Sequence, residues 1–291
     1  DVNILKHLEK GKVVTGTRVE PPLHPDGAEK ILRNFGIEVD EFNMEEWYEK
    51  SDLLKNERVT EGIFAPWCMY KEDFLSIGGH DELFAPQSKE DSDLFNRFHL
   101  KGYKFVQPWD ALVYHFTSRG SRFNKHSGGA AGKNSDEWIQ TTTKNGRNFI
   151  RKWGHFIKHD LLMKPIVPPK YNIGLIIKNC NSSLLHALEP WGDTIYVDQG
   201  NIPTLIKKYI EEEQSNTIID LNKRVLPFDN EKQNEILVEI DGKTFSEEDW
   251  KILMQLPEII KDSGSIGRFQ LNNIKVEIIQ MNECQNDLIN I

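Results

Sequence analysis

The feature that most constrains the fold of this chain is a proline-rich stretch just past its middle. The segment KPIVPPKYN, residues 164–172, contains Pro165, Pro168 and Pro169. Proline has no backbone N–H group and restricts the residue before it, so this stretch can continue neither a helix nor a central strand. It predicts a stiff, extended connection. We therefore expect two units, residues 1–164 and residues 171–291.

The second unit has a regular pattern. Apolar segments typical of strands occupy residues 172–180, 193–198, 216–221, 235–241 and 274–281. Helical patterns cover residues 203–214 and 246–263, and Ser246 with Asp249 three residues later predicts a capping box at the start of the latter. These residues predict a small α/β domain. No catalytic constellation occurs in it, so a structural or docking role is the default interpretation.

The first unit is less regular and rich in aromatic residues. Helices are predicted over residues 3–11, 44–56 and 137–154, a single strand over residues 12–20, and strand-type segments on either side of Pro108. Residues 61–79 read as a strand, a turn and a short helix. Residues 118–138 are rich in glycine and serine with interspersed basic residues, which is typical of a mobile loop that closes over a site.

Composition excludes several classes of protein. The net charge of −9 and pI of about 5.6, without a long basic run, argue against nucleic acid as a partner. The three cysteines, Cys68, Cys180 and Cys284, are far apart and form no C-x-x-C pair, which fits a reducing compartment. No apolar run approaches the roughly 20 residues needed to span a bilayer. We expect no membrane span, a cytoplasmic location, and a natural start upstream of the first residue.

An acidic cluster raises the question of function. The segment GGHDELFAPQSKEDSDLFNRF, residues 78–98, places Glu90 and Asp91 side by side at the predicted start of a helix. A purely structural interpretation exists, because Ser88 and Asp91 have capping-box spacing and acidic residues are favoured in a first helical turn. Asp93 and Arg97, four residues apart, are also expected to pair.

Three observations favour a functional interpretation. Asp91, Phe95 and Phe98 share one helix face, so the carboxylate lies at the edge of a buried surface, where its pKa would rise toward that of a useful base. The preceding Gly78-Gly79 pair lets backbone approach a ligand closely. The indole of Trp67 suits the apolar face of a sugar ring or a nucleobase, although Trp67 and Trp109 also fit a plain core.

The order of these motifs resembles the acceptor-side half of a family 2-like, GT-A-fold glycosyltransferase. Such enzymes show a G-G-x-D-E turn, an E-D pair that opens a helix, an arginine, a G-Y or G-F pair, and a histidine after a strand. The corresponding residues here are Gly78, Gly79, Asp81 and Glu82; Glu90 and Asp91; Arg97; Gly102 and Tyr103; and His115. The segment FIRKWG, residues 149–154, also resembles a closing helix of that family. The resemblance covers roughly residues 1–160, so it implies an α/β fold with a partial GT-A-like domain followed by a small α/β domain.

The resemblance implies an inverting transfer of a sugar, of hexosyltransferase type, from a nucleotide-sugar donor to a glycan or other hydroxyl acceptor. Asp91 would be the general base, and Glu90 would hold the acceptor. Trp67, Gly79 and Asp81 would contribute to substrate binding, and Arg119 and Arg122 could reach phosphate oxygens. His115 matches a position that is a metal ligand in some relatives, so Mn²⁺ or Mg²⁺ is implied as cofactor.

The sequence also departs from the family pattern. Several relatives have W-G-G directly before the E-D pair, where this chain has residues 86–89 as PQSK, which leaves the acceptor open. The D-x-D metal motif is absent, and we expect it upstream of Asp1 together with the nucleotide-binding strands. A non-catalytic carbohydrate- or nucleotide-sugar-binding module is therefore the alternative.

Other motifs carry less weight. The segment SGGAAGKNS lacks the first glycine and the final Ser or Thr of a phosphate-binding loop. His155 and His159 are four residues apart in a predicted helix but have no third zinc ligand, so packed or solvated histidines are the simpler interpretation. His115 alone could equally be a core histidine bonded to backbone. A glycoside hydrolase needs two carboxylates across a cleft, and adjacent Glu90 and Asp91 point in different directions.

Overall fold

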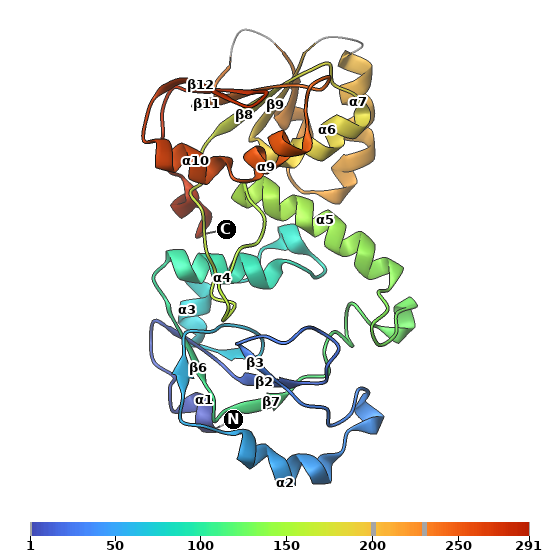
Figure 1. The fold of residues 1–291 in the computed structure, drawn as a ribbon, viewed down its shortest axis with the longest axis vertical. Coiled ribbons are helices and arrows are strands. Elements are labelled where there is room, and N and C mark those ends of the chain that lie inside the picture. Colours follow the sequence, from blue (N-terminus) through green and yellow to red (C-terminus); the bar gives the residue numbers. More distant parts are fainter. Residues whose placement is uncertain (1, 199–201, 229–231, 291) are drawn as a thin grey trace.

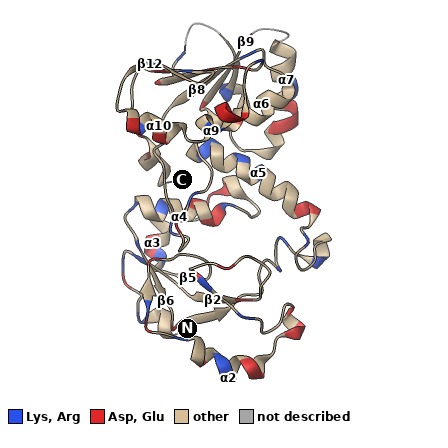
Figure 2. Ribbon diagram, viewed as in Figure 1, with Lys and Arg blue, Asp and Glu red and all other residues tan. Residues whose placement is uncertain are grey.

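The chain is a mixed α/β protein in which three sheets are distributed over two halves (Figure 1). The computed structural model describes residues 2–198, 202–228 and 232–290. Within these ranges, no helix has the length and apolar character needed to cross a membrane. Basic and acidic residues are interspersed over both halves (Figure 2).

The N-terminal half contains short strands and five α-helices, joined by turns of 3₁₀ helix (η). Its elements are α1 (Val2–Leu5), β1 (Lys12–Thr15), β2 (Thr17–Glu20), β3 (Lys30–Leu32), η1 (Val39–Glu41), α2 (Met44–Leu54), β4 (Val59–Thr60), β5 (Trp67–Cys68), α3 (Lys71–Leu75), η2 (Glu82–Phe84), α4 (Glu90–Leu100), β6 (Lys104–Pro108), β7 (Leu112–Tyr114), η3 (Lys125–Ser127) and α5 (Asp136–Trp153).

The C-terminal half alternates strands and helices in its first part and ends in a β-hairpin and a 3₁₀ turn. Its elements are β8 (Ile173–Lys178), α6 (Ser182–Leu188), η4 (Glu189–Trp191), β9 (Thr194–Asp198), α7 (Ile202–Glu213), η5 (Gln214–Asn216), α8 (Leu221–Arg224), β10 (Val225–Pro227), β11 (Ile236–Asp241), α9 (Glu247–Met254), α10 (Leu256–Ser263), β12 (Gly267–Leu271), β13 (Ile274–Ile278) and η6 (Gln285–Leu288).

Two small sheets make up the N-terminal half, with strand orders β4-β6-β1-β5 and β3-β2-β7. The prediction of one strand over residues 12–20 is wrong, because Gly16 divides it into β1 and β2, which belong to different sheets. A Cβ at Gly16 would lie 2.9 Å from the Val113 side chain, so the bend brings backbone close to the neighbouring strand. Strands β3 and β7 both pair with β2 in parallel, so their carboxyl ends meet at one edge.

The C-terminal sheet has the order β10-β9-β8-β11-β13-β12, with parallel pairing from β10 to β11 and antiparallel pairing from β11 to β12. Helices α6, α9 and α10 lie between this sheet and the rest of the molecule (Figure 1). The capping box of Ser246 and Asp249 is confirmed. The strand predicted over residues 216–221 is wrong, since these residues form the end of η5, a turn and the start of α8. Helix α6 and strands β10 and β12 were not predicted.

Helix α5 joins the two halves. Phe149 and Trp153 pack with Leu83 and Phe84 of the N-terminal half, whereas Ile150 belongs to the core of the C-terminal half. The proline-containing residues 164–172 form no helix or strand, as predicted, and connect the halves as an extended segment. Neighbouring side chains of one helix therefore contribute to both cores.

Candidate functional site

Helix α4 begins at Glu90, after an unusual turn. Ser88 and Lys89 both have left-handed backbone angles, with φ of 79° and 77°, and Lys89 is the N-cap without a side-chain cap bond. The predicted capping box of Ser88 and Asp91 is therefore wrong. The Ser88 hydroxyl instead bonds the Thr142 hydroxyl of α5 at 3.0 Å. This turn fixes the helix start against α5, and it leaves Glu90 and Asp91 unused as caps.

Asp91 lines a small cavity of about 40 Å³. Burial raises the pKa of its carboxyl group, and the charge of nearby His80 offsets part of this effect. Among the described residues, no side chain hydrogen-bonds to this carboxylate. Phe95 and Phe98 on the same helix face are buried, as the spacing predicted. Asp91 is therefore a carboxylate with a raised pKa that is free to accept a proton. The cavity is lined by Phe64, Asp91, Ser92, Phe95, Asn96, Ile157, Lys158, His159, Met163 and Pro165.

Two further polar groups near this cavity lack partners in the described part of the chain. The Asn96 side chain is 3% exposed and lines the cavity, and its Nδ2 donor makes no hydrogen bond. The Glu90 Oε2 atom is likewise buried without a partner, and burial followed by the charge of Asp91 raises the pKa of Glu90. An unpaired buried polar group is costly, so unpaired groups beside a cavity point to a ligand that bonds them.

Asp93 has a different environment from Asp91. It is fully buried and bonded by Arg97, by Lys152 at 2.6 Å and by the Trp153 indole at 2.9 Å, so the predicted Asp93–Arg97 pair is confirmed. Arg97 also donates to the carbonyls of Ile77 and Gly79, both at 2.6 Å. This network holds the glycine turn against α4 and α5.

Gly79 and Asp81, both expected to bind substrate, are part of this internal network. Gly79 has a φ of 78°, and its carbonyl accepts the bond from Arg97. The Asp81 carboxylate pairs with Lys152 at 2.7 Å and accepts a bond from the Leu83 backbone N–H, and Asp81 does not line the Asp91 cavity. These contacts position the turn rather than present a polar group to a ligand.

His115 lies at the carboxyl edge of the small parallel sheet. It follows β7, and its Nδ1 atom is 2.8 Å from Oε1 of Glu20 at the end of β2. Burial opposes ionisation of Glu20, but the hydrogen bond from His115 and the charges of Arg18 and Lys30 outweigh it and lower the pKa of Glu20 to about 2. The ionised carboxylate accepts a hydrogen bond from Nδ1–H. In the neutral form of the imidazole, Nε2 then carries the lone pair, and the side chain is 37% exposed.

We call the group of Arg18, Glu20, Glu29, Lys30 and His115 the His115 cluster. Its ion pairs run from Arg18 to Glu20 at 2.6 Å, from Lys30 to Glu20 at 3.2 Å, and from Arg18 to Glu29 at 3.3 Å. His24 is close enough to Lys30, Glu20 and His115 for their charges to act on it, and Arg122 acts on His24 in turn. Glu20 and His115 lie at the carboxyl ends of β2 and β7, where ligands of α/β proteins typically bind, whereas Glu29 and Lys30 lie at the amino end of β3.

Phe64 connects the two regions. Its ring lines the Asp91 cavity, the guanidinium of Arg18 lies 3.7 Å from its centroid, and the His115 ring is 6.4 Å away. The Asp91 cavity and the His115 cluster therefore adjoin through one aromatic side chain. The structure places Asp91 and His115 in neighbouring regions.

The other residues predicted to bind substrate are Trp67, Arg119 and Arg122. Trp67 is half-buried and packs against Phe74, His80 and Phe98, which makes it part of a core cluster. Arg119 bonds the Ile37 carbonyl through Nε, but its two terminal nitrogens are buried without partners in the described residues. Arg122 bonds Asn134 at 2.6 Å. Residues 118–135 form turns, η3 and an isolated bridge.

His115 is the residue that the sequence predicted as a metal ligand. Among the described residues, no group of three or more His, Cys, Asp or Glu side chains could hold a metal ion. His115 nevertheless has the arrangement of a metal-binding histidine, because a carboxylate fixes its other nitrogen. His155 and His159 lie beyond the end of α5, so the predicted helical pair is wrong. His155 is buried against Phe149 and Trp153, and its pKa falls to about 4 through burial.

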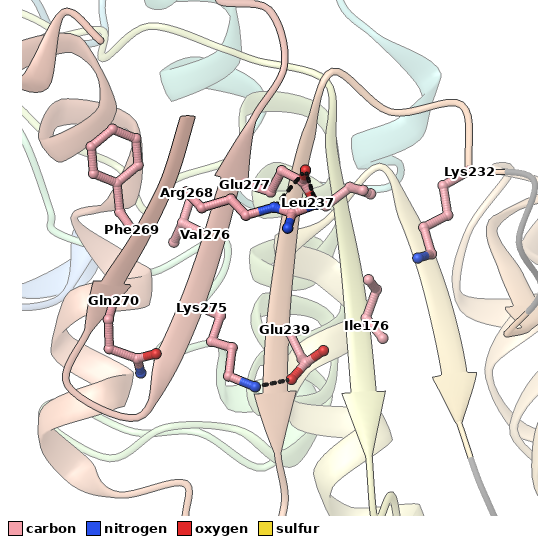
Figure 3. Close-up of a pocket in the computed structure, with 10 residues that line it drawn as sticks. All are labelled: Ile176, Lys232, Leu237, Glu239, Arg268, Phe269, Gln270, Lys275, Val276 and Glu277. Carbon is pink, nitrogen blue, oxygen red and sulfur yellow. Dashed lines mark hydrogen bonds and ion pairs between the residues drawn. The ribbon is translucent and has the colours of Figure 1, made fainter. Parts of the chain in front are cut away.

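A second hollow, of about 450 Å³, lies on the face of the C-terminal sheet opposite helices α6, α9 and α10 (Figure 3). Its charges are largely paired, since Arg268 bonds Glu277 at 2.9 Å and Lys275 bonds Glu239 at 2.7 Å. The fifth charged residue of the lining, Lys232, lies over the Phe228 ring. Asp91 does not line this hollow, and the two carboxylates that do, Glu239 and Glu277, are both engaged in ion pairs.

Sequence reasoning missed four residues of this region: Glu20, His24, Phe64 and Asn96. Glu20 ends β2 directly before a Pro-Pro pair, which is a signal for a carboxylate at a strand end. Asn96 lies five residues after Asp91, and a polar residue between Phe95 and Phe98 on a buried face was a usable signal. No local pattern points to Phe64 or His24. Comparisons with protein-family models, curated proteins and solved structures gave no match for this chain.

Proposed function

We propose that this chain is a glycosyltransferase that moves a sugar, with inversion, from a nucleotide-sugar donor to a hydroxyl group of a glycan, and that its fold is a partial GT-A-like domain followed by an α/β domain. One observation carries the proposal. Asp91 is a half-buried, unbonded carboxylate with a raised pKa, and its cavity adjoins a charged cluster through Phe64. In this proposal, proton acceptance at Asp91 and phosphate binding beside His115 take place in neighbouring regions.

The chemistry assigned to Asp91 is general-base catalysis. Its carboxylate takes the proton of an acceptor hydroxyl as that oxygen bonds to the anomeric carbon, and the bond from that carbon to the diphosphate breaks on the opposite side. The bonding electrons leave with the diphosphate. Asn96, whose Nδ2 is unpaired, and Glu90 would hold the acceptor hydroxyls. The raised pKa brings the carboxyl group closer to the pH at which it must exchange protons.

The leaving diphosphate requires positive charge. Arg119, Arg122 and the exposed edge of the His115 cluster supply it in this proposal, and the two unpartnered terminal nitrogens of Arg119 can form charge-assisted bonds to phosphate oxygens. Mn²⁺ or Mg²⁺ would be held by Nε2 of His115 and by oxygens of the donor itself. When bound, such an ion stabilises the charge that develops on the diphosphate.

Transfer by an Asp91→Asn variant tests the proposal. We expect the full chain, given Mn²⁺, a panel of nucleotide sugars and a panel of glycans, to form a product. The variant should bind the donor normally and transfer about 10²–10⁴ times more slowly, because an amide cannot take the proton. The wild-type rate should rise with pH through the raised pKa of Asp91, since only the ionised form acts, and this dependence should vanish in the variant.

A matched control is Asp52→Asn, which changes an exposed carboxylate paired with Lys55 on α2. It should leave the rate and its pH profile unchanged. Wild-type transfer by Asp91→Asn would show that the base lies elsewhere. Donor binding without transfer to any acceptor would favour the alternative, a non-catalytic nucleotide-sugar-binding module.

A further inference from the structure

A pocket of about 480 Å³ lies where α5 meets the C-terminal half. We call it the junction pocket. Its lining includes Gly146 and Ile150 of α5, Phe156 and Ile157 from the segment after α5, Trp191 of η4 and Trp250 of α9. Both halves of the chain therefore contribute walls to one concave surface, which is where ligand sites often occur.

The junction pocket adjoins the Asp91 cavity. Ile157 lines both, so the two pockets share this residue as a wall. Lys89, directly before Glu90 and Asp91, also lines the junction pocket. A molecule that presents a hydroxyl group to Asp91 and extends beyond it would next contact the junction pocket.

The walls of the junction pocket are aromatic, with polar groups beside them. The Phe156 and Trp191 rings lie 4.9 Å apart in an edge-to-face arrangement, and Trp191 and Trp250 lie 5.6 Å apart. Phe156 is 48% exposed although it is large and apolar. Thr143 and Lys89 supply a hydroxyl and an ammonium group. Flat apolar rings beside a few hydrogen-bonding groups fit a sugar ring, which has apolar C–H faces and a polar rim.

Gly146 provides an independent observation. It lies inside α5, where glycine is less favourable than alanine. A Cβ added at Gly146 would meet no atom within 4 Å, so packing among the described residues does not require glycine there. The missing side chain keeps the helix backbone open to the pocket, which is the use of glycine where a ligand approaches closely.

We propose that the junction pocket binds the sugar residue next to the reacting one in an oligosaccharide acceptor. This inference rests on the proposed function, because it takes Asp91 as the point of reaction. It assigns a task to the C-terminal half, which supplies Trp191 and Trp250 to the acceptor site. The substrate class is then an oligosaccharide rather than a single sugar.

Glycan binding by pocket variants tests this inference. Binding of the full chain is first measured on a printed array of defined mono- and oligosaccharides that includes an octyl glycoside. The oligosaccharide that binds most tightly and its terminal monosaccharide are then titrated by calorimetry. Gly146→Leu fills the pocket with a side chain that favours helix, and Trp250→Ala removes a wall. Gln140→Leu adds the same leucine at an exposed position of α5 and is the control. Melting temperatures check that each variant is folded.

We expect wild type to bind the oligosaccharide about tenfold or more tightly than the monosaccharide. This difference in affinity should be lost in Gly146→Leu and Trp250→Ala and kept in Gln140→Leu. Equal binding by wild type and both pocket variants would overturn the inference. So would equal affinity for the two sugars, binding of the octyl glycoside alone, or no glycan binding.

The inference and the proposed function can fail separately. Pocket-dependent glycan binding, combined with transfer that Asp91→Asn leaves unchanged, would keep the subsite and refute the assigned base. Asp91-dependent transfer, combined with a Gly146→Leu variant that keeps the wild-type preference for the oligosaccharide acceptor, would keep the function and refute the subsite.

Discussion

At the residue scale, Asp91 and Asp93 show how two nearby carboxylates on one helix differ in role. Asp91 faces a cavity and is unbonded, whereas Asp93 is fully buried and bonded by Arg97, Lys152 and Trp153. The Asp93–Arg97 pair could be predicted, because residues four apart share a helix face. The bonds from Lys152 and Trp153 could not, because those residues are some 60 positions away in sequence.

Neutralising Asp93 should destabilise the protein strongly. We expect Asp93→Asn to lower the free energy of unfolding by about 3–5 kcal/mol, because it leaves the buried charges of Arg97 and Lys152 uncompensated. Urea denaturation measures this. Asp52→Asn, which breaks an exposed pair with Lys55, should cost about 1 kcal/mol or less. Equal midpoints for the two variants would contradict the assigned role of Asp93.

At the element scale, strongly periodic helices and strands could be predicted from the sequence, whereas the geometry of turns could not. Helices α2, α5 and α7 and strands β8, β9, β11 and β13 agree with prediction. The start of α4 does not, because Ser88 and Lys89 have left-handed angles and the Ser88 hydroxyl bonds Thr142, which is distant in sequence, instead of capping the helix. Residues 216–221 have a strand-like sequence, yet Asp220 caps α8, and the capping bond outweighs the apolar pattern.

The glycine turn before α4 offers a test at this scale. Gly79 has a φ of 78°, and an added Cβ would lie 3.2 Å from the Phe74 ring. Gly79→Ala should therefore lower the free energy of unfolding by about 1–2 kcal/mol through backbone strain. Thermal or urea unfolding measures it. Gly120→Ala, at a position without such an angle and with open space around it, should be nearly neutral, and a loss as large as that of Gly79→Ala would refute the strain argument.

At the scale of the whole molecule, a buried charge network joins the halves. Glu189 of η4 is fully buried and bonded by Arg151 of α5 at 2.7 Å, by Arg224 at 2.6 Å and by the Tyr209 hydroxyl at 2.8 Å. Burial alone would raise the pKa of Glu189, but Arg224 and Arg151 outweigh it and lower the pKa to about 2. The sequence predicted a break at residues 164–172, but it gave no sign that α5, which ends at Trp153 before the break, packs against the half that follows it.

Breaking this network should weaken the connection between the halves. We expect wild type to unfold in one calorimetric transition, and Glu189→Gln to lose about 3–5 kcal/mol and to show two. Because the pKa of Glu189 is lowered, its contribution is complete above the ordinary glutamate pKa and is lost as pH falls toward about 2. A single transition at the wild-type temperature in the variant would contradict this account.

The central claim is that the chain binds and uses a nucleotide sugar, and calorimetric titration tests it most directly. The full chain would be titrated with UDP-, GDP- and CDP-sugars with and without Mn²⁺, beside His115→Ala and, as a control, His126→Ala at an exposed position. The account predicts binding of one nucleotide class that Mn²⁺ strengthens in wild type and in His126→Ala but not in His115→Ala. No binding of any nucleotide sugar by the folded wild-type chain, with or without Mn²⁺, would contradict it.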